Sequence, residues 1–224
     1  MSTSLQPIRV LILYYSYSGQ SSVLVRRLAT GLGDQGAVVH QERICPLHPL
    51  RFPLGSIFKT IRLMLTTFFR RRHPIQPLEV GEGEPWDLVI LGGPTWSWNA
   101  SGPILRLLDT YPQLFRGRPV LALISCRGYW STHWHYLRRR LTRMGATPLG
   151  PLVFDHPQAE PWRTLGVFFK IAGIAPERSS SPLSRFYRHF GHTPEQFEAA
   201  QQLGRRLATH LKAGSIPPDF KYIP

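Results

Sequence analysis

The clearest chemical feature of the chain is a small polar loop, Ser16-Tyr17-Ser18-Gly19-Gln20-Ser21, which follows a strongly apolar run. The hydroxyl groups of Ser16, Ser18 and Ser21 can donate to an anion, and Gly19 allows a close backbone approach. A helix that begins here adds free backbone N–H groups and the positive end of its dipole. The loop contains no lysine or arginine, so it predicts a phosphate held by N–H and O–H groups alone. A strand-to-helix turn capped by serines has the same composition, and the loop alone does not separate the two interpretations.

Two later loops contain the aromatic and small residues that suit a planar ring. Pro94-Thr95-Trp96-Ser97-Trp98-Asn99 provides two indoles for stacking and an amide that can reach heteroatoms at the ring edge. The same tryptophans can instead cap the core or contact another subunit. Cys126-Arg127-Gly128-Tyr129 follows a further apolar run and adds a glycine and another aromatic ring.

Apolar runs alternate with helical patterns around these loops. We expect strands at residues 8–15, 37–41, 86–92, 120–125 and 149–154 and helices in residues 23–32, 102–108, 135–144 and 193–214. This alternation predicts a doubly wound α/β fold: a five-stranded parallel sheet of order 2-1-3-4-5 with helices on both faces. The three loops then meet at the carboxyl edge of the sheet, where ligands bind in such folds.

The length of 224 residues is consistent with one domain, residues 1–224, that carries two insertions at about 46–85 and 155–192. Residues 56–72 of the first insertion predict an amphipathic helix with an aromatic, apolar stripe and a basic end. This helix suits either an anionic membrane surface or a lid packed on the domain. Residues 162–174 are also apolar and basic, and the two segments can jointly wall an apolar pocket.

The net charge is +14, from 27 lysines and arginines and 13 acids, which favours acidic partners. No helix-turn-helix, RNA-recognition or zinc-finger pattern accompanies the scattered arginines, so nucleic acid is a poor candidate partner. No cysteine or histidine pair has the spacing of a zinc site, and the N-terminus lacks the pattern of a secretory signal. We therefore expect a cytoplasmic location, at the inner membrane face if residues 56–72 bind lipid, and leave homo-oligomer formation open.

The three loops together carry a resemblance. Ser16-Tyr17-Ser18-Gly19-Gln20-Ser21 resembles the flavodoxin phosphate signature, Thr/Ser-x-Thr/Ser-Gly-x-Thr/Ser, at its expected place after the first strand. Gly92-Gly93-Pro94-Thr95-Trp96 is similar to the second flavin loop of flavodoxin-like NAD(P)H oxidoreductases, and the loop after Ser125 occupies the place of the third. The resemblance covers residues 8–41, 86–156 and 193–213.

The resemblance implies FMN as cofactor, with its phosphate on Ser16, Ser18, Gly19, Gln20 and Ser21 and its ring between residues 94–99 and 126–129. NADPH or NADH is then the expected electron donor, and a hydrophobic molecule such as a quinone the acceptor. Flavodoxin carriers are acidic whereas this chain is basic, which favours an enzyme over a carrier of that type. Two alternatives remain: an electron-transfer module docked on a membrane or an acidic partner, and a biosynthetic enzyme. For the latter, the YYSYSGQ opening resembles flavodoxin-like proteins of dialkylresorcinol synthesis.

Four further side chains are candidates for a direct role beside such a ring. His133 and His135 follow the third loop and are candidate proton donors, or else exposed histidines on a basic helix. Arg127 is a candidate for the phosphate of a nicotinamide cofactor. Cys126 is either a reactive thiol or a small packed residue.

Overall fold

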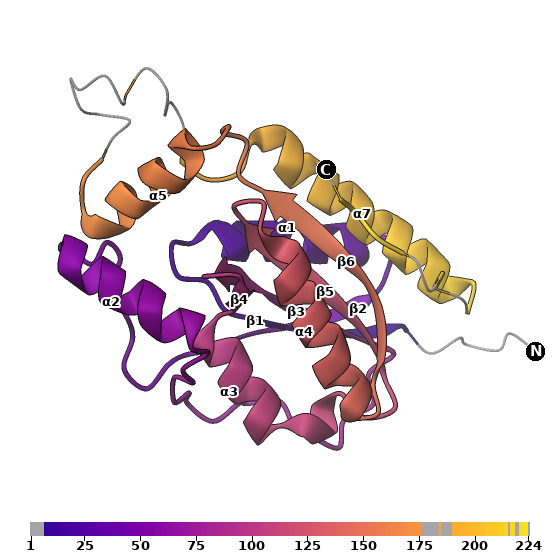
Figure 1. Cartoon of the computed structure of the whole chain (residues 1–224). Helices are drawn as coiled ribbons and strands as arrows, with labels where there is room; N and C mark the ends of the chain where they lie inside the picture. The colour runs from indigo at the N-terminus through magenta and orange to yellow at the C-terminus, as the bar shows by residue number, and fades with distance from the viewer. Residues whose placement is uncertain (1–6, 176–183, 185–189, 215, 218–219, 224) are drawn as a thin grey trace, which may run out of the picture.

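The computed structural model describes residues 7–175, 184, 190–214, 216–217 and 220–223 of the chain. Its centre is a sheet of five parallel strands in the order β2-β1-β3-β5-β6 (Figure 1). These strands are β1 (Arg9–Tyr14), β2 (Val38–Arg43), β3 (Leu88–Trp96), β5 (Pro119–Cys126) and β6 (Thr147–Asp155). The strand β4 (Asn99–Ala100) pairs antiparallel with β3. Without β4, the order is the predicted 2-1-3-4-5.

Helices cover both faces of the sheet, as predicted (Figure 1). One face packs against α1 (Gln20–Gly33) and α7 (Pro194–Lys212), and the other against α3 (Gly102–Thr110) and α4 (Trp130–Arg143). Successive residues of β1 point to opposite faces, so Ile12 joins the first core and Leu13 the second. Strands buried on both faces explain why the predicted runs were apolar throughout.

The start of α7 follows the predicted capping pattern. The Gln196 N–H donates to Thr193 Oγ1 over 3.3 Å, and the Thr193 N–H donates to Gln196 Oε1 over 3.0 Å. The helix then packs closely on α1, where glycines allow the two backbones to approach.

The region predicted as a loop at residues 94–99 is partly strand, so that prediction is wrong in its secondary structure. Strand β3 continues as far as Trp96. Ser97 and Trp98 then form a two-residue turn, and Asn99, in β4, pairs with Trp96. Both turn residues have positive φ, 44° and 66°, as expected of a hairpin turn that is usually built from Asn and Gly. The extra pairing to β4 is what keeps the backbone extended beyond the parallel sheet.

Each predicted insertion contains a helix at the carboxyl edge of the sheet, and these two helices contact each other (Figure 1). The first contains α2 (Ile57–Phe68), and the second contains α5 (Trp162–Ala172). The Leu54 N–H donates to Ile171 O over 2.8 Å, and Gly55 lies directly against Gly173. Residues 176–183 and 185–189 of the second predicted insertion lie outside the described residues. A short helix, η1 (Pro112–Leu114), follows α3.

Candidate functional site

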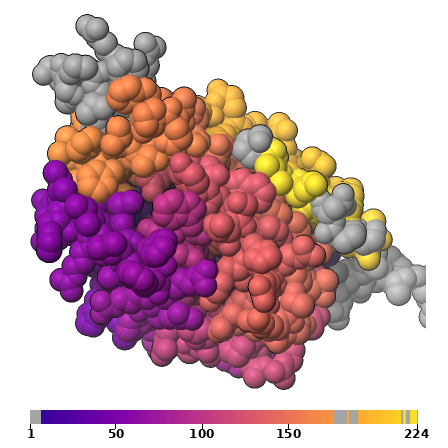
Figure 2. All heavy atoms as spheres, in the orientation of Figure 1, coloured from indigo at the N-terminus to yellow at the C-terminus, as the bar shows by residue number. Residues whose placement is uncertain are grey.

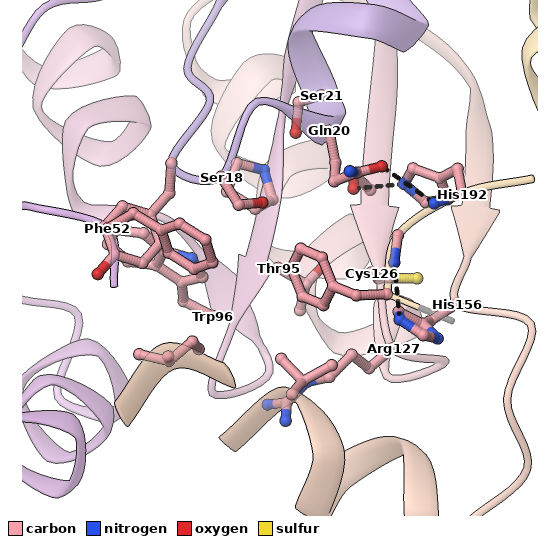
Figure 3. Close-up of a pocket in the computed structure, with 17 residues that line it drawn as sticks. Ser18, Gln20, Ser21, Phe52, Thr95, Trp96, Cys126, Arg127, His156 and His192 are labelled. Carbon is pink, nitrogen blue, oxygen red and sulfur yellow. Dashed lines mark hydrogen bonds between the residues drawn. The ribbon is translucent and has the colours of Figure 1, made fainter. Parts of the chain in front are cut away.

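A pocket of about 670 Å³, partly open to solvent, lies beyond the ends of β1, β3, β5 and β6 (Figure 3). This is the edge at which the sequence predicted a ligand. We call it the main pocket. It is lined by Tyr17, Ser18, Gln20, Ser21, Phe52, Pro94, Thr95, Trp96, Ser125, Cys126, Arg127, His156, Val167, Ile171, Phe190, Gly191 and His192.

The first loop has the geometry of an anion site. Gly19 adopts a left-handed conformation with φ of 87° and is the N-cap of α1. The Ser22 N–H donates to Ser16 Oγ over 3.3 Å, which orders the turn from within. Within the described residues, the backbone N–H groups of residues 18–21 make no hydrogen bond. No atom lies within 4 Å of the position that a Cβ would take at Gly19, so the backbone there faces open space. These donors at a helix N-terminus are therefore available to an anion.

A loop from the far end of the chain closes one side of the main pocket. The His192 N–H donates to Gln20 Oε1 over 3.0 Å, so the loop rests on the start of α1 (Figure 3). Gly191 allows this contact, because a Cβ there would lie 2.4 Å from the same oxygen. Gln20, predicted as a phosphate residue, thus also holds this closing loop.

Two buried histidines in the main pocket, His156 and His192, were not predicted. His192 Nε2 lies 2.8 Å from Ser125 Oγ, and its Nδ1 lies 3.3 Å from Gln196 Oε1. His156 Nε2 accepts a hydrogen bond of 3.1 Å from the Gly191 N–H. Each side chain is 5% exposed. They lie at the two ends of the second predicted insertion. His156 directly follows Asp155, the last residue of β6, and this position after a strand end is the sequence signal that would have indicated His156 as a pocket residue.

Aromatic rings form the opposite wall of the main pocket. Trp96 and Phe52 each meet the ring of Tyr17 edge-to-face, at centroid distances of 5.4 and 5.1 Å. The Tyr17 hydroxyl donates to Arg51 O over 3.0 Å, and burial raises the pKa of Tyr17 to about 12. Phe52 comes from the first insertion, while Val167 and Ile171 come from α5 in the second. Both insertions therefore line this pocket.

Two residues of the second predicted loop are occupied in holding α2. The amide of Asn99 donates to the carbonyl oxygens of Thr67, Phe68 and Ser97, and its Oδ1 accepts from Arg70 Nε over 2.7 Å. Ser97 Oγ donates to Met64 O over 2.9 Å. The hydrogen-bonding groups of Asn99 are directed at the C-terminal end of α2 rather than into the main pocket.

The third loop places Cys126 in the main pocket as a buried thiol. Its Sγ accepts from the Gly128 N–H over 3.4 Å, and burial is the largest cause that raises the pKa of Cys126 to about 12. Arg127 Nη1 donates to Thr164 O over 3.5 Å and borders both the main pocket and a smaller cavity of about 470 Å³. That smaller cavity is lined by Met64, Thr95, Ser97, Trp98, Arg127, Tyr129 and Thr164.

The structure places the two predicted histidines away from the main pocket. His133 is 2% exposed, and its Nδ1 lies 2.8 Å from Thr95 Oγ1. Burial lowers the pKa of His133 to about 3, so its ring is neutral at pH 7. The interpretation of His133 as an exposed histidine is therefore wrong. His135 is exposed in a basic groove on α4. A proton-donor role for either histidine stays a prediction.

Eight of the residues predicted to bind the phosphate or the ring line the main pocket: Ser18, Gln20, Ser21, Pro94, Thr95, Trp96, Cys126 and Arg127. The smaller cavity contains Ser97, Trp98 and Tyr129. Ser16, Gly19, Asn99 and Gly128 line neither cavity, although Ser16 and Gly19 shape the loop that does.

Comparisons with known proteins give no match to a family model and none to a curated sequence. The fold, in contrast, is found among solved structures. A flavodoxin from the domain Archaea has a TM-score of 0.50 at 13% identity, covering 92% of this chain and 99% of its own. An FMN complex of a flavoprotein from Lactobacillus acidophilus NCFM has a TM-score of 0.53 at 21% identity, covering 65% of this chain and 93% of its own. Rubredoxin oxygen:oxidoreductase from Desulfovibrio gigas has a TM-score of 0.51 at 16% identity over 93% of this chain, which spans 37% of that protein.

The chain has a flavodoxin-like fold. This confirms the predicted fold class and the order of the parallel strands. The first loop of this flavodoxin-like chain lies where β1 meets α1, and residues of both insertions line the pocket at the same edge. The main pocket therefore combines a predicted part of the fold, the three strand ends, with walls that belong to this chain's own insertions.

Proposed function

We propose that this flavodoxin-like chain binds FMN in the main pocket and acts as an NAD(P)H-dependent oxidoreductase toward a hydrophobic acceptor. The observation that carries the proposal is the juxtaposition of an anion site and an apolar, aromatic-walled pocket at one sheet edge. The Lactobacillus flavoprotein shares the fold and is in complex with FMN, which agrees with this assignment. When bound, the flavin would supply the hydride chemistry, and the protein would supply orientation and a dry environment.

The residues of the first loop fit a phosphate monoester. Ser18, Gln20 and Ser21 line the main pocket, and the N–H groups of residues 18–21 make no hydrogen bond within the described residues. Gly19 leaves room for an anion beside the backbone. A phosphate carries charge toward the N-terminus of α1, where the helix dipole stabilises it. No cation is needed at this position.

The remaining walls suit a planar ring that is apolar on its faces and polar at its edge. Trp96 and Phe52 offer ring surfaces on one side, while Val167 and Ile171 approach from α5. Ser125 and Cys126 provide backbone and side-chain groups at the strand end, near the hydrogen-bonded His192. These groups would position the ring and exclude water from it.

The insertions favour an apolar acceptor. Four of the residues that they contribute to the main pocket are hydrophobic, namely Phe52, Val167, Ile171 and Phe190, and the others are His156, Gly191 and His192. Arg127, at the boundary between the main pocket and the smaller cavity, is the residue we assign to a phosphate of the nicotinamide donor. The smaller cavity is the adjoining space in which the second reactant would lie.

A matched pair of glycine variants tests the cofactor site. Gly19 and Gly36 both have positive φ, 87° and 79°, and neither has an atom within 4 Å of a Cβ position. Gly19→Ala and Gly36→Ala therefore carry similar backbone strain. Only Gly19 faces the anion site, because Gly36 lies between α1 and β2 at the opposite edge of the sheet.

The measurement is a titration of the purified full-length chain with FMN, followed by visible absorbance and by quenching of flavin fluorescence. We expect binding to the parent protein, at least about tenfold weaker binding to Gly19→Ala, and parent-like binding to Gly36→Ala, because only the first variant disturbs the phosphate contacts. Absence of FMN binding, or equal loss in both variants, contradicts the proposed site.

The reaction is tested separately by adding NADH or NADPH to the FMN-bound protein, with a soluble quinone as acceptor. Bleaching of the flavin spectrum and quinone-dependent oxidation of the nicotinamide are the expected results. A protein that binds FMN but oxidises neither nicotinamide would refute the enzymatic part and favour an electron-transfer module.

A further inference from the structure

Helix α2 presents its apolar stripe to solvent instead of to the core. Its two buried residues are Thr60 and Thr67, which face the domain. Phe58 is 75% exposed, and Ile61 and Leu65 are exposed as well. An amphipathic helix of a globular protein normally buries its apolar residues, so this orientation needs another explanation.

The exposed apolar surface continues beyond the helix. The Phe68 ring lies 6.2 Å from that of Trp98, and Trp98 lies 5.7 Å from Tyr129, as centroid distances. Phe69, just after the helix, is 76% exposed. We call this surface the apolar face. It consists of Ile57, Phe58, Ile61, Leu65, Phe68, Phe69, Trp98 and Tyr129.

Figure 2 shows where this surface lies in the molecule. Helix α2, in purple, lies at the left side of the molecule, and its neighbour α5 is shown in orange. Trp98 is held outward by a turn whose two residues both have positive φ, a conformation that a tryptophan rarely adopts. A contiguous exposed apolar surface of this kind marks an interaction site.

Positive charge borders the apolar face, and negative charge is absent from its segment. Residues 51–78 contain six lysines and arginines and no acid. Lys59, Arg62 and Arg71 are exposed and form no ion pair within the described residues. Beside the end of α2 lies an open groove lined by Arg70, His135, Arg139, Arg140 and Arg143, among others. The partner must therefore be apolar at its centre and anionic at its border.

We propose that the apolar face binds the surface of an anionic phospholipid bilayer. The aromatic and aliphatic side chains would enter the boundary between headgroups and acyl chains, and Lys59, Arg62 and Arg71 would meet the phosphates. A helix of 12 residues is about 18 Å long, shorter than the hydrocarbon core, so it lies in the plane of the surface.

A second copy of the chain suits the surface less well. Two copies joined through this surface would bring Lys59 and Arg62 of each near the same cations of the other, and no carboxylate in residues 51–78 compensates them. A bilayer with anionic lipids supplies both the apolar medium and the negative charge.

The position of the apolar face has a consequence for the site. Trp98 and Tyr129 of the apolar face also line the smaller cavity, together with Met64 of α2. This cavity shares Thr95 and Arg127 with the main pocket. A bilayer-dissolved acceptor would therefore reach the site without crossing water. This consequence rests on the proposed function, whereas the lipid contact itself does not.

The test is flotation of the full-length chain with vesicles of phosphatidylcholine, alone or with about 30% phosphatidylglycerol, which supplies a negative surface potential. Phe58→Glu with Leu65→Glu removes the apolar contact, and Arg62→Glu with Arg71→Glu removes the charge contact. Arg26→Glu is the control, because Arg26 is an exposed arginine of α1, on the other face of the sheet. Circular dichroism and thermal unfolding establish that each variant is folded.

We expect binding to the anionic vesicles, a fall of about tenfold or more in the apparent partition constant for each α2 double variant, and no comparable fall for Arg26→Glu. Parent protein that stays with the buffer in both vesicle types overturns the proposal, and so does equal binding of all variants. Loss of a dimer in Phe58→Glu with Leu65→Glu, seen by sedimentation without any vesicle binding by the parent, would identify a second copy as the occupant. FMN binding is measured on the same samples, so a failed lipid contact is distinguished from a failed flavin site.

Discussion

Burial of His133 should make the free energy of unfolding fall as the pH is lowered below about 6.5. Its ring is 2% exposed, lies 2.8 Å from Thr95 Oγ1 and faces the interior of the domain. Burial disfavours the charged form and lowers the pKa of His133 from 6.5 to about 3 in the folded state. The unfolded chain keeps the ordinary value. Between these two values, the unfolded state binds a proton that the folded state does not.

The sign follows from this difference. The stabilisation is fully present above pH 6.5 and is lost progressively as the pH falls toward 3. The loss grows by about 1.4 kcal/mol per pH unit and reaches roughly 5 kcal/mol once both states are protonated. Between pH 7.5 and pH 5, His133 alone should lower the free energy of unfolding by about 2 kcal/mol.

The assay compares urea unfolding of the parent protein with that of His133→Gln at several pH values between 7.5 and 5. Gln stays neutral and keeps a polar group near Thr95, so the variant lacks this pH dependence whatever its absolute stability. His135→Gln is the matched control, because this histidine lies on the same helix but is exposed. If the curves of free energy against pH run parallel for the parent and His133→Gln, the reasoning is refuted. An NMR titration of His133 near pH 6.5 would refute it as well.

Three further predictions follow from contacts of single residues. Gly31→Ala should lower the free energy of unfolding in urea by about 1–3 kcal/mol, because its Cβ would lie 1.9 Å from Gln201 O. Gly33→Ala, which has open space on the same helix, should raise it by up to about 1 kcal/mol, and equal effects of the two variants would contradict this. Asn99→Ala should lower the free energy of unfolding by about 1–3 kcal/mol and speed hydrogen exchange in residues 57–69 but not in β1, because the end of α2 loses its amide partner. Unchanged exchange in residues 57–69 would argue against this role of Asn99. The exposed Cys45 should react with a disulfide reagent at once, and Cys126 only after unfolding, because burial raises its pKa to about 12; two equally fast thiols would disprove the difference.

The sheet was predictable because its signal is local. Each run such as residues 8–15 or 120–125 is apolar on both faces, and that pattern identifies a buried parallel strand without knowledge of its neighbours. The start of α7 was predictable for the same reason, since its capping residues lie within four positions. The hairpin at residues 96–99 was missed because Ser97 and Trp98 lack the glycine or asparagine that usually reveals such a turn.

The site was predictable as far as strand ends determine it. Ser18, Thr95 and Cys126 line one pocket because parallel strands finish at the same edge. His156 and His192 were missed because they meet only through the fold, 36 positions apart, where the Gly191 N–H reaches one ring and Ser125 the other. The roles of Asn99 and Ser97 were likewise set by a helix some 30 residues earlier, which the local sequence does not reveal.

Periodicity identified the apolar stripe of α2 but did not determine which way the stripe faces. In most soluble domains, the apolar side turns inward because burial of each large side chain contributes about 1.5–3 kcal/mol. Here the two threonines face inward, and Thr67 Oγ1 lies 2.9 Å from Ser97 Oγ. Asn99 and Arg70 add hydrogen bonds that hold the C-terminal end of α2 in this rotation. This rotation leaves Ile61, Leu65 and Phe68 exposed, which is the feature on which the proposed bilayer contact depends. The vesicle experiment therefore tests which of the two interpretations of residues 56–72 holds.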